Sequence, residues 1–219
     1  MYLTPTPCFD YVHPAVQTLL KRVLPAAASP REQAVALYYA VRDGIRYNPY
    51  VFEARSRSFS ASYCLQAGES YCIPKAVLLG ALCRAAGIPA RLGLADVKNH
   101  LASPALLAYL QSDVFVMHGY TDIFLDGQWV KATPAFDAAL CQKMGVAPLE
   151  FDGRTDSVFQ PYNLKGEQHM EYLADHGTHA DVPVNFIVQQ VVRAYPHLVQ
   201  QALQGKTGGR SLQQDVDAG

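Results

Sequence analysis

The segment Gly68–Arg91, GESYCIPKAVLLGALCRAAGIPAR, places Cys72 at the start of an apolar stretch with helical spacing. The first turn of a helix has unpaired N–H groups and the positive end of the helix dipole, and both favour a thiolate. The backbone N–H of Cys72 would also point toward an oxyanion formed by attack on a carbonyl. These features predict a nucleophilic cysteine; the alternative is a small buried hydrophobic residue. Cys83, about three turns along the same helix, is expected only to pack.

A thiol nucleophile needs a base that later protonates the leaving group, and His118 is the candidate because it begins a strongly predicted strand. The dipeptide Asp126-Gly127 predicts a two-residue hairpin turn. This turn pairs Leu125 with Gln128 and, further along, His118 with Ala135. Side chains on one face of the predicted hairpin are then His118, Tyr120, Asp122, Trp129, Lys131 and Thr133. The alternative interpretation of His118 is a hydrogen-bonded core histidine.

The order of these motifs resembles the transglutaminase-like superfamily, whose fold is similar to that of the papain-like cysteine proteases. The matching features are Gly-x-x-x-Cys at a helix start, Arg-Ala-Ala-Gly-Ile-Pro-Ala-Arg at its end, a histidine on a strand, and Asp-Gly-x-Trp-Val on the next. The resemblance covers roughly 34–137. It implies an α+β fold in which a helical N-terminal part carries the nucleophile at a helix N-terminus, packed on an antiparallel sheet.

The resemblance implies a Cys–His–Asp site with Cys72 as nucleophile and His118 as base. The sequence departs from the family at the third position, because Thr133 stands where an Asp is usual. Either Thr133 accepts a hydrogen bond from the imidazole, or Asp137 swings back to do so; Asp137 is slightly preferred, and a simple turn is the alternative to both. Tyr120 and Asp122 replace a common Trp and Glu, and Asp122 is interpreted as a structural partner of Lys131.

Three aromatic residues are candidates for substrate binding, namely Tyr71, Tyr120 and Trp129, although for Trp129 packing against Phe124 is the favoured interpretation. The run HMEYLADHGTHAD contains His169, His176 and His179 beside acidic residues. These residue types can bind metal, but the spacing fits no metalloenzyme motif. We expect a solvated loop or an edge of the substrate cleft there, with no metal and no cofactor. No calcium-site motif of the D-x-D-x-D-G type is present either.

Composition excludes several function classes for the 219 residues. The net charge of −1 argues against a nucleic-acid partner, and no apolar run is long enough to cross a membrane. The N-terminus lacks the features of a signal peptide, and the five cysteines form no C-x-x-C pair. We therefore expect reduced thiols in a cytoplasmic protein with neither nucleic-acid nor membrane partners. The oligomeric state cannot be predicted.

Apolar periodicity predicts one domain over 1–205 and a disordered tail over 206–219. Helices are expected at 14–24, from 30 to about 43, at 72–86, at 103–111 and from 183 onward, with a strand near 89–97. The segment 103–111 could cover the site as a lid, with an ordinary crossover as the alternative. A loop is expected at 53–71, and mostly irregular chain over 138–182.

Three functions compete. The first is cysteine-dependent acyl transfer on an amide of a peptide, a protein or a small molecule, either as a peptidase or amidase or as a transglutaminase-like enzyme. The second is an inactive scaffold of the same fold that binds proteins or peptides. The third is a metal-dependent hydrolase that uses the histidines of 169–181.

Overall fold

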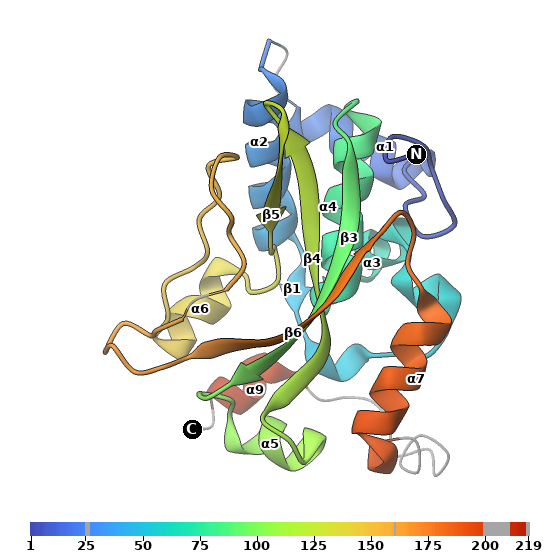
Figure 1. Ribbon diagram of the computed structural model, residues 1–219. Helices are drawn as coiled ribbons and strands as arrows, with labels where there is room; N and C mark the ends of the chain where they lie inside the picture. Colours follow the sequence, from blue (N-terminus) through green and yellow to red (C-terminus); the bar gives the residue numbers. More distant parts are fainter. Residues whose placement is uncertain (25–26, 160, 199–210, 218–219) are drawn as a thin grey trace.

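The computed structural model describes residues 1–24, 27–159, 161–198 and 211–217. An antiparallel sheet covers one side of a group of helices, and the long helix α4 (Cys72–Ala85) lies directly beneath the sheet (Figure 1). The sheet has the strand order β5-β4-β3-β6. Its strands are β3 (Ala90–Asn99), β4 (Val114–Leu125), β5 (Gln128–Ala132) and β6 (Met170–His179). The expected α+β fold is therefore confirmed.

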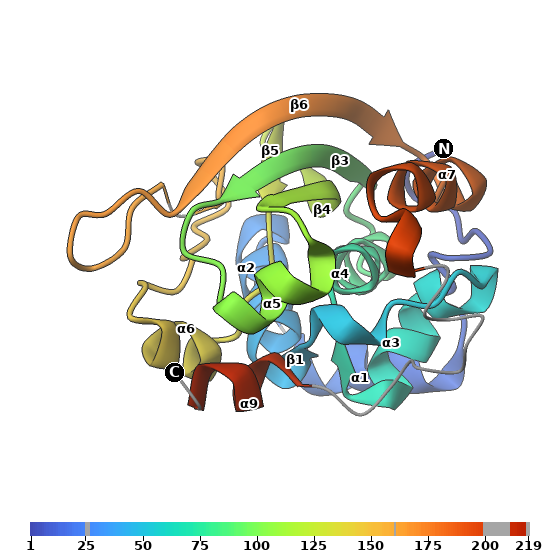
Figure 2. The same cartoon turned by 90° about the horizontal axis from the view of Figure 1, so that it is seen from below.

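In the part of the chain that the structure describes, seven further helices surround α4 and the sheet (Figure 2). They are α1 (Pro14–Val23), α2 (Pro30–Gly44), α3 (Ala61–Ala67), α5 (Pro104–Leu110), α6 (Ala138–Met144), α7 (Val184–Ala194) and α9 (Leu212–Asp217). Two short strands, β1 (Arg46–Tyr47) and β2 (Glu69–Ser70), form a separate parallel pair. Two 3-10 turns, Pro49–Val51 and Ser56–Phe59, complete the described elements.

Local signals explain where α2 begins. The hydroxyl of Ser29 accepts a hydrogen bond from the backbone N–H of Glu32, and the Glu32 carboxylate accepts one from the N–H of Ser29. Pro30 occupies the first helical position, where its missing N–H costs nothing. The capping box predicted from SPRE is thus present.

Helix α4 is the central element of the core. All its residues from Cys72 to Arg84 are buried, because the sheet covers one side and α1, α2 and α3 cover the other. Such a helix is mostly apolar on every side, and its two charged side chains, Lys75 and Arg84, donate hydrogen bonds to backbone carbonyls. The hydroxyl of Thr121 on β4 donates a hydrogen bond to the carbonyl of Ala76, at 2.8 Å. This contact fixes the face of β4 that meets the helix.

The hairpin of β4 and β5 has the register that the Asp126-Gly127 turn predicts: Leu125 pairs with Gln128, and Thr121 with Ala132. Asp126 and Gly127 both have positive φ, as a type I′ turn requires. One detail differs. Asp122 forms its ion pair with Arg91 on β3, at 2.7 Å, while the ammonium group of its register partner Lys131 lies 5.0 Å from the ring centre of Tyr120.

The segments expected to be loops contain more structure than their composition indicates. The range 53–71 contains α3 and β2, and 138–182 contains α6 and β6. Strand β6 escaped prediction because it is an edge strand in which half-buried positions alternate with exposed polar ones. In the tail, α9 occupies Leu212–Asp217, where disorder was expected; residues 206–210 and 218–219 lie outside the described residues. Within the described part of the chain, no helix is long and apolar enough to cross a membrane.

Candidate active site

Cys72 is the first residue of α4 and follows the N-cap residue Tyr71. Its side chain is buried, with 9% of the residue exposed. The backbone N–H groups of Gly119, Ile73 and Cys72 itself act on the thiol, and each lowers its pKa. The helix start therefore supplies the donors that the sequence predicted, and β4 adds one more.

Burial outweighs these donors. Removal of the thiol from water raises the pKa of Cys72 to about 11. Burial therefore opposes the thiolate that the helix start was expected to favour. Cys83 behaves as expected for a packing residue, since it is fully buried and burial raises its pKa to about 12.

Strand β4 meets the helix start at Gly119. A Cβ atom at Gly119 would lie 2.8 Å from the Cα of Ile73 and 3.1 Å from its backbone nitrogen. Only glycine allows so close an approach. The backbone of His118 and Gly119 therefore lies directly against the residue that follows Cys72, so the fold brings the two parts of the expected site together.

The backbone before His118 is irregular. Met117 has a φ of +59°, and its N–H donates a hydrogen bond to the carboxylate of Asp96, at 2.9 Å. Asp96 lies on β3, where the pairing of β3 with β4 shifts between Ala95 and Val97. This bulge breaks the ladder directly before His118, as bulges beside functional sites often do.

His118 is buried, and desolvation lowers its pKa to about 4. Gly119 and Thr121 face α4, so the alternation of the strand makes His118 leave β4 on the same side as Tyr120. The Nε2 atom of His118 has no hydrogen-bond partner. Among the described residues, no hydrogen bond links its ring to Cys72, Thr133 or Asp137.

The two candidate orienting residues have different surroundings. The Asp137 carboxylate caps α6 by accepting the N–H of Leu140 at 2.9 Å, and it also accepts the N–H of Tyr47 at 3.1 Å. Asp137 is thus engaged in holding backbone together. Thr133 is buried, and its Oγ1 has no partner. The pairing of β4 with β5 ends at Ala132, and the N–H of Thr133 donates a hydrogen bond to the carbonyl of Ser157, so the hydroxyl of Thr133 is free of the hairpin ladder. The preference for Asp137 therefore gives way to Thr133.

Of the predicted substrate-binding residues, only Tyr71 lines the pocket at Cys72. Tyr120 is 1% exposed, and its ring covers Gly93, where a Cβ would come within 2.0 Å of the ring. Trp129 contacts Tyr2 and Phe124 near the hairpin turn and lies under the guanidinium of Arg91, at 3.9 Å. Both residues are therefore packing residues, and their assignment to substrate binding is wrong.

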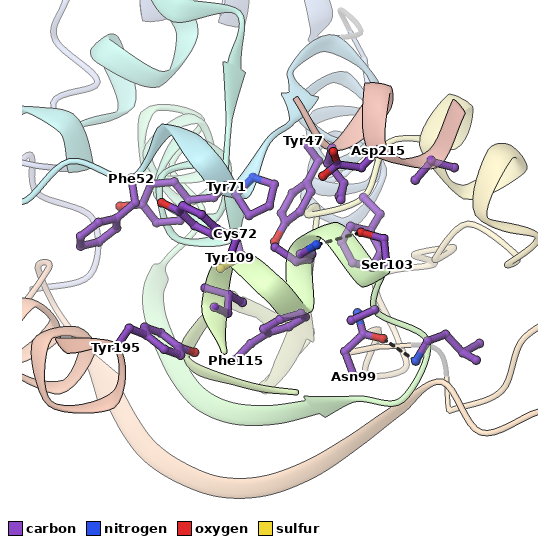
Figure 3. A pocket seen from close by; sticks show the side chains of 18 of the residues that line it. Tyr47, Phe52, Tyr71, Cys72, Asn99, Ser103, Tyr109, Phe115, Tyr195 and Asp215 are labelled. Atoms are coloured by element: carbon purple, nitrogen blue, oxygen red, sulfur yellow. Dashed lines mark hydrogen bonds between the residues drawn. The ribbon is translucent and has the colours of Figure 1, made fainter. Parts of the chain in front are cut away.

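A cavity of about 350 Å³ opens at Cys72 (Figure 3). Its walls come from the helix start, from β4, from the ends of α5 and α7, and from α9. Seven aromatic side chains of the described residues line it, those of Tyr47, Phe52, Tyr71, Tyr109, Phe115, Phe136 and Tyr195. The segment 103–111 therefore forms part of the wall of this cavity.

Sequence reasoning missed most of this wall. Tyr195 follows α7, and its hydroxyl donates to the carbonyl of Val114 at 2.6 Å and accepts the N–H of Val116 at 3.0 Å. No local signal connects Tyr195 with β4, because 79 residues separate it from Val116. The phenol side chains of Tyr47 and Tyr50 come from a connector that composition alone presents as an ordinary turn.

The histidines of 169–181 form no metal site among the residues that the structure describes. His169 is fully buried beside the ring of Phe136, and burial lowers its pKa to about 4. His176 Nε2 lies 2.9 Å from the Asp96 carboxylate, and the ring of His179 reaches the carbonyl of His176. His176 and His179 belong to β6 and His169 directly precedes it, so all three help to hold β6 in place.

A family model described as the transglutaminase-like superfamily matches residues 17–134, which is more than half of the chain. The chain belongs to this superfamily. No curated protein matches it significantly. The matched range holds Cys72, His118 and Thr133 and ends before Asp137.

Two solved structures are similar to this chain to different degrees, and only the first has a TM-score above 0.5. One, titled a "Putative Cysteine Protease" from Cytophaga hutchinsonii, has a TM-score of 0.52 and 17% identity and covers 85% of this chain and 48% of its own. The other, titled a "Putative Protease" from Parabacteroides distasonis, has a TM-score of 0.37 and 14% identity over 53% of this chain and 22% of its own. The chain thus spans about half the length of the first neighbour.

Proposed function

We propose that this protein catalyses acyl transfer from an amide through Cys72, with His118 as the base. The observation that carries the proposal is the position of the Cys72 sulfur, which lies at the wall of a cavity and within a set of three backbone N–H groups. Membership of the transglutaminase-like superfamily and the fold of a cysteine-protease-like neighbour support a cysteine-based reaction. Whether water or an amine accepts the acyl group is left to experiment.

The chemistry proceeds from two neutral groups, since burial holds the thiol protonated and the imidazole unprotonated. The Cys72 sulfur attacks the amide carbonyl while its proton passes to His118, and the carbonyl oxygen becomes an oxyanion near the N–H groups of the helix start. The C–N bond then breaks as protonated His118 gives its proton to the departing amine. Water or a second amine finally cleaves the thioester and regenerates the thiol.

This step requires the imidazole to come within hydrogen-bond reach of the sulfur. Catalytic hydrogen bonds are often long or misaligned in free enzymes and tighten only when substrate binds. Gly119 lies against the helix start, but the His118 side chain leaves β4 on the face away from α4, so the imidazole has to reorient, next to the irregular backbone at Met117, to reach the sulfur. Thr133, whose hydroxyl has no partner, is the proposed neutral residue that holds the second ring nitrogen.

The test is to incubate the purified protein with a panel of chromogenic N-acyl amides and to follow amine release. Wild type is expected to turn over at least one amide and to form an acyl-enzyme whose mass adduct maps to Cys72. Cys72→Ala should abolish both signals. Cys83→Ala is the matched control, because Cys83 belongs to the same helix but has no role in the reaction. Equal turnover by Cys72→Ala and wild type would reject the proposal. Added amines, assayed by product mass, separate hydrolysis from transamidation.

A second candidate function is an inactive scaffold that binds a peptide or protein. Two observations favour it: Thr133 replaces the family's Asp, and Cys72 and His118 are both neutral and not hydrogen-bonded to each other. It predicts that Cys72→Ala retains partner binding and that no acyl-enzyme forms with any amide. Detection of an acyl-enzyme on Cys72 would eliminate it.

A further inference from the structure

We infer that the acyl group accepted by this site is apolar and uncharged, of a size between an aliphatic chain of six to eight carbons and a bicyclic aromatic ring. The inference rests on the proposed function and names its substrate class. It comes from three properties of the cavity at Cys72: its lining, its size and its position relative to His118. Each property is considered in turn.

The lining offers little to a polar or charged group. Asn99 and Ser103 line the cavity, but Asn99 Oδ1 accepts the N–H of Leu101 and Ser103 Oγ accepts the N–H of Leu106 (Figure 3). The only charged residues among the described lining are Lys143, which is exposed, and Asp215, whose carboxylate is bound by the Tyr50 hydroxyl. A carboxylate or an ammonium group in this cavity would lose its hydration without a new partner, which costs several kcal/mol or more.

The remaining walls are aromatic and aliphatic. Tyr47, Phe115 and Phe136 present rings to the cavity, and Leu106, Val191 and Leu212 add aliphatic groups from α5, α7 and α9. The phenol groups of Tyr47 and Tyr71 add a few polar atoms, and the buried Tyr71 hydroxyl has no partner. A ligand that fills the cavity would therefore gain mainly from burial of its own apolar surface.

The volume limits the size of the group. A dry cavity of about 150 Å³ holds one benzene molecule, so the cavity of about 350 Å³ holds a group roughly twice that size. An octanoyl chain or a naphthyl ring meets this limit. A longer chain would have to reach solvent through the open side.

The cavity lies on the acyl side of the reaction. Cys72, Ile73 and Met117 line it, whereas His118 is absent from its described lining. Since His118 protonates the departing amine, the amine leaves toward His118 and the acyl part stays on the other side of the sulfur. The group that enters the cavity is therefore attached to the carbonyl carbon.

Linear aldehydes test this without requiring turnover, because a thiol adds its S–H across the C=O bond to give a hemithioacetal with no other reactant. We expect butanal, hexanal and octanal to protect Cys72 from iodoacetamide, with apparent affinity rising about fourfold per methylene. The charged probe 4-oxobutanoate should bind at least tenfold more weakly than butanal. Protection is read by mass spectrometry of the Cys72 peptide.

Two variants on α7 provide matched controls. Val191→Trp fills the cavity and should remove the gain from hexanal to octanal, whereas Gln189→Trp places the same ring at an exposed position and should leave the series unchanged. Circular dichroism and thermal melting verify that both variants are folded. If the gain in affinity from hexanal to octanal is lost in both variants, or in neither, the assignment of this cavity to the acyl group is contradicted.

The outcomes separate the two proposals. Affinity that does not depend on chain length, or that is higher for 4-oxobutanoate, overturns the substrate class while a Cys72 adduct still supports acyl transfer. Absence of any adduct on Cys72 overturns the proposed function. In that case butanol and octanol, compared by thermal shift in wild type and Val191→Trp, show whether the cavity binds apolar chains regardless of chemistry.

Discussion

Replacement of Gly119 by alanine tests whether the contact between β4 and the start of α4 determines both stability and reactivity. The added Cβ would lie 2.8 Å from the Cα of Ile73, 3.0 Å from its Cγ1 and 3.1 Å from its nitrogen. Carbon atoms pack best at about 3.5–4.0 Å, so strand and helix must separate by roughly 0.7 Å or more. Two of these three atoms belong to the backbone, which leaves no side-chain rotation that could relieve the clash.

The expected loss of stability follows from two opposing effects. Overpacking of a core costs about 1–3 kcal/mol, whereas removal of a glycine from a strand interior returns about 0.5–1 kcal/mol. The net destabilisation should therefore be about 1–2 kcal/mol. Urea unfolding followed by far-UV circular dichroism measures it, with Gly44→Ala as the control. A Cβ at Gly44 meets nothing within 4 Å at the end of α2, so this variant should be as stable as wild type or slightly more stable.

The effect on the site should exceed the effect on stability. A displacement of about 1 Å between catalytic groups can lower a rate about 100-fold, and here the N–H of Gly119 is also one of the three donors to the Cys72 thiol. We expect Gly119→Ala to reduce amide turnover 30- to 100-fold, roughly, at a temperature where it is fully folded. A folded Gly119→Ala that matches wild type in both midpoint and turnover would refute this account of the site.

Four more predictions concern the buried groups. The pKa of His118 is lowered in the folded protein to about 4 from an ordinary value near 6.5, so the stability that the neutral imidazole allows is present above pH 6.5 and is lost as pH falls toward 4. His118→Gln has no group to protonate there, so it should remove up to about 3 kcal/mol of this acid destabilisation. Urea unfolding at pH 7 and pH 4.5 measures the difference. Asp137→Ala should lower the free energy of unfolding by about 1 kcal/mol, because α6 loses its N-cap. Asp137→Ser should keep both the cap and full turnover. A stable but inactive Asp137→Ser would instead make Asp137 the orienting residue. Thr133→Val should leave stability unchanged, because Oγ1 has no partner, but lower kcat about tenfold with little change in KM; an unchanged kcat would remove Thr133 from the mechanism. Burial raises the pKa of Cys72 to about 11 and lowers that of His118 to about 4, so neither group should titrate between pH 6 and 9. We therefore expect kcat/KM to stay flat over this range wherever the protein is folded. A rise with a midpoint between pH 7 and 8.5 would indicate a pre-formed thiolate.

Local chemistry explains the elements that could be predicted from the sequence. The capping box at Ser29 and Glu32 fixes the start of α2, and the Asp126-Gly127 turn fixes every pair of the hairpin. Both signals act within a few residues, so no knowledge of the remaining chain is needed. The same holds for Cys72 at the first position of α4, where a Gly-Ile-Pro sequence marks the far end of the helix.

The features that escaped prediction depend on contacts between distant segments. Tyr195 reaches β4 from the end of α7, and Leu212 of α9 packs into the cavity at Cys72. Asp137 was misjudged for a related reason. It was proposed because Thr133 replaces the family's Asp and Asp137 follows shortly after, whereas the carboxylate is bound by the N–H groups of Leu140 and Tyr47. Composition alone cannot distinguish a cap from a catalytic carboxylate.

Two opposing effects act on the charge of Cys72, and their balance indicates how the site can work. A helix start stabilises an anion only to the extent that the anion is not also removed from water. Here α5, α7, α9 and the aromatic walls exclude water from the sulfur, and the desolvation exceeds the effect of three N–H donors. An apolar acyl group in the cavity would also keep water away from the sulfur. Substrate binding therefore does not bring in the solvent that would stabilise a thiolate. The same low-polarity surroundings strengthen the hydrogen bonds from the N–H groups of Gly119, Ile73 and Cys72 to an oxyanion. In such a site the donors contribute most when negative charge develops during the attack, and this favours an attack in which the proton leaves sulfur as the S–C bond forms.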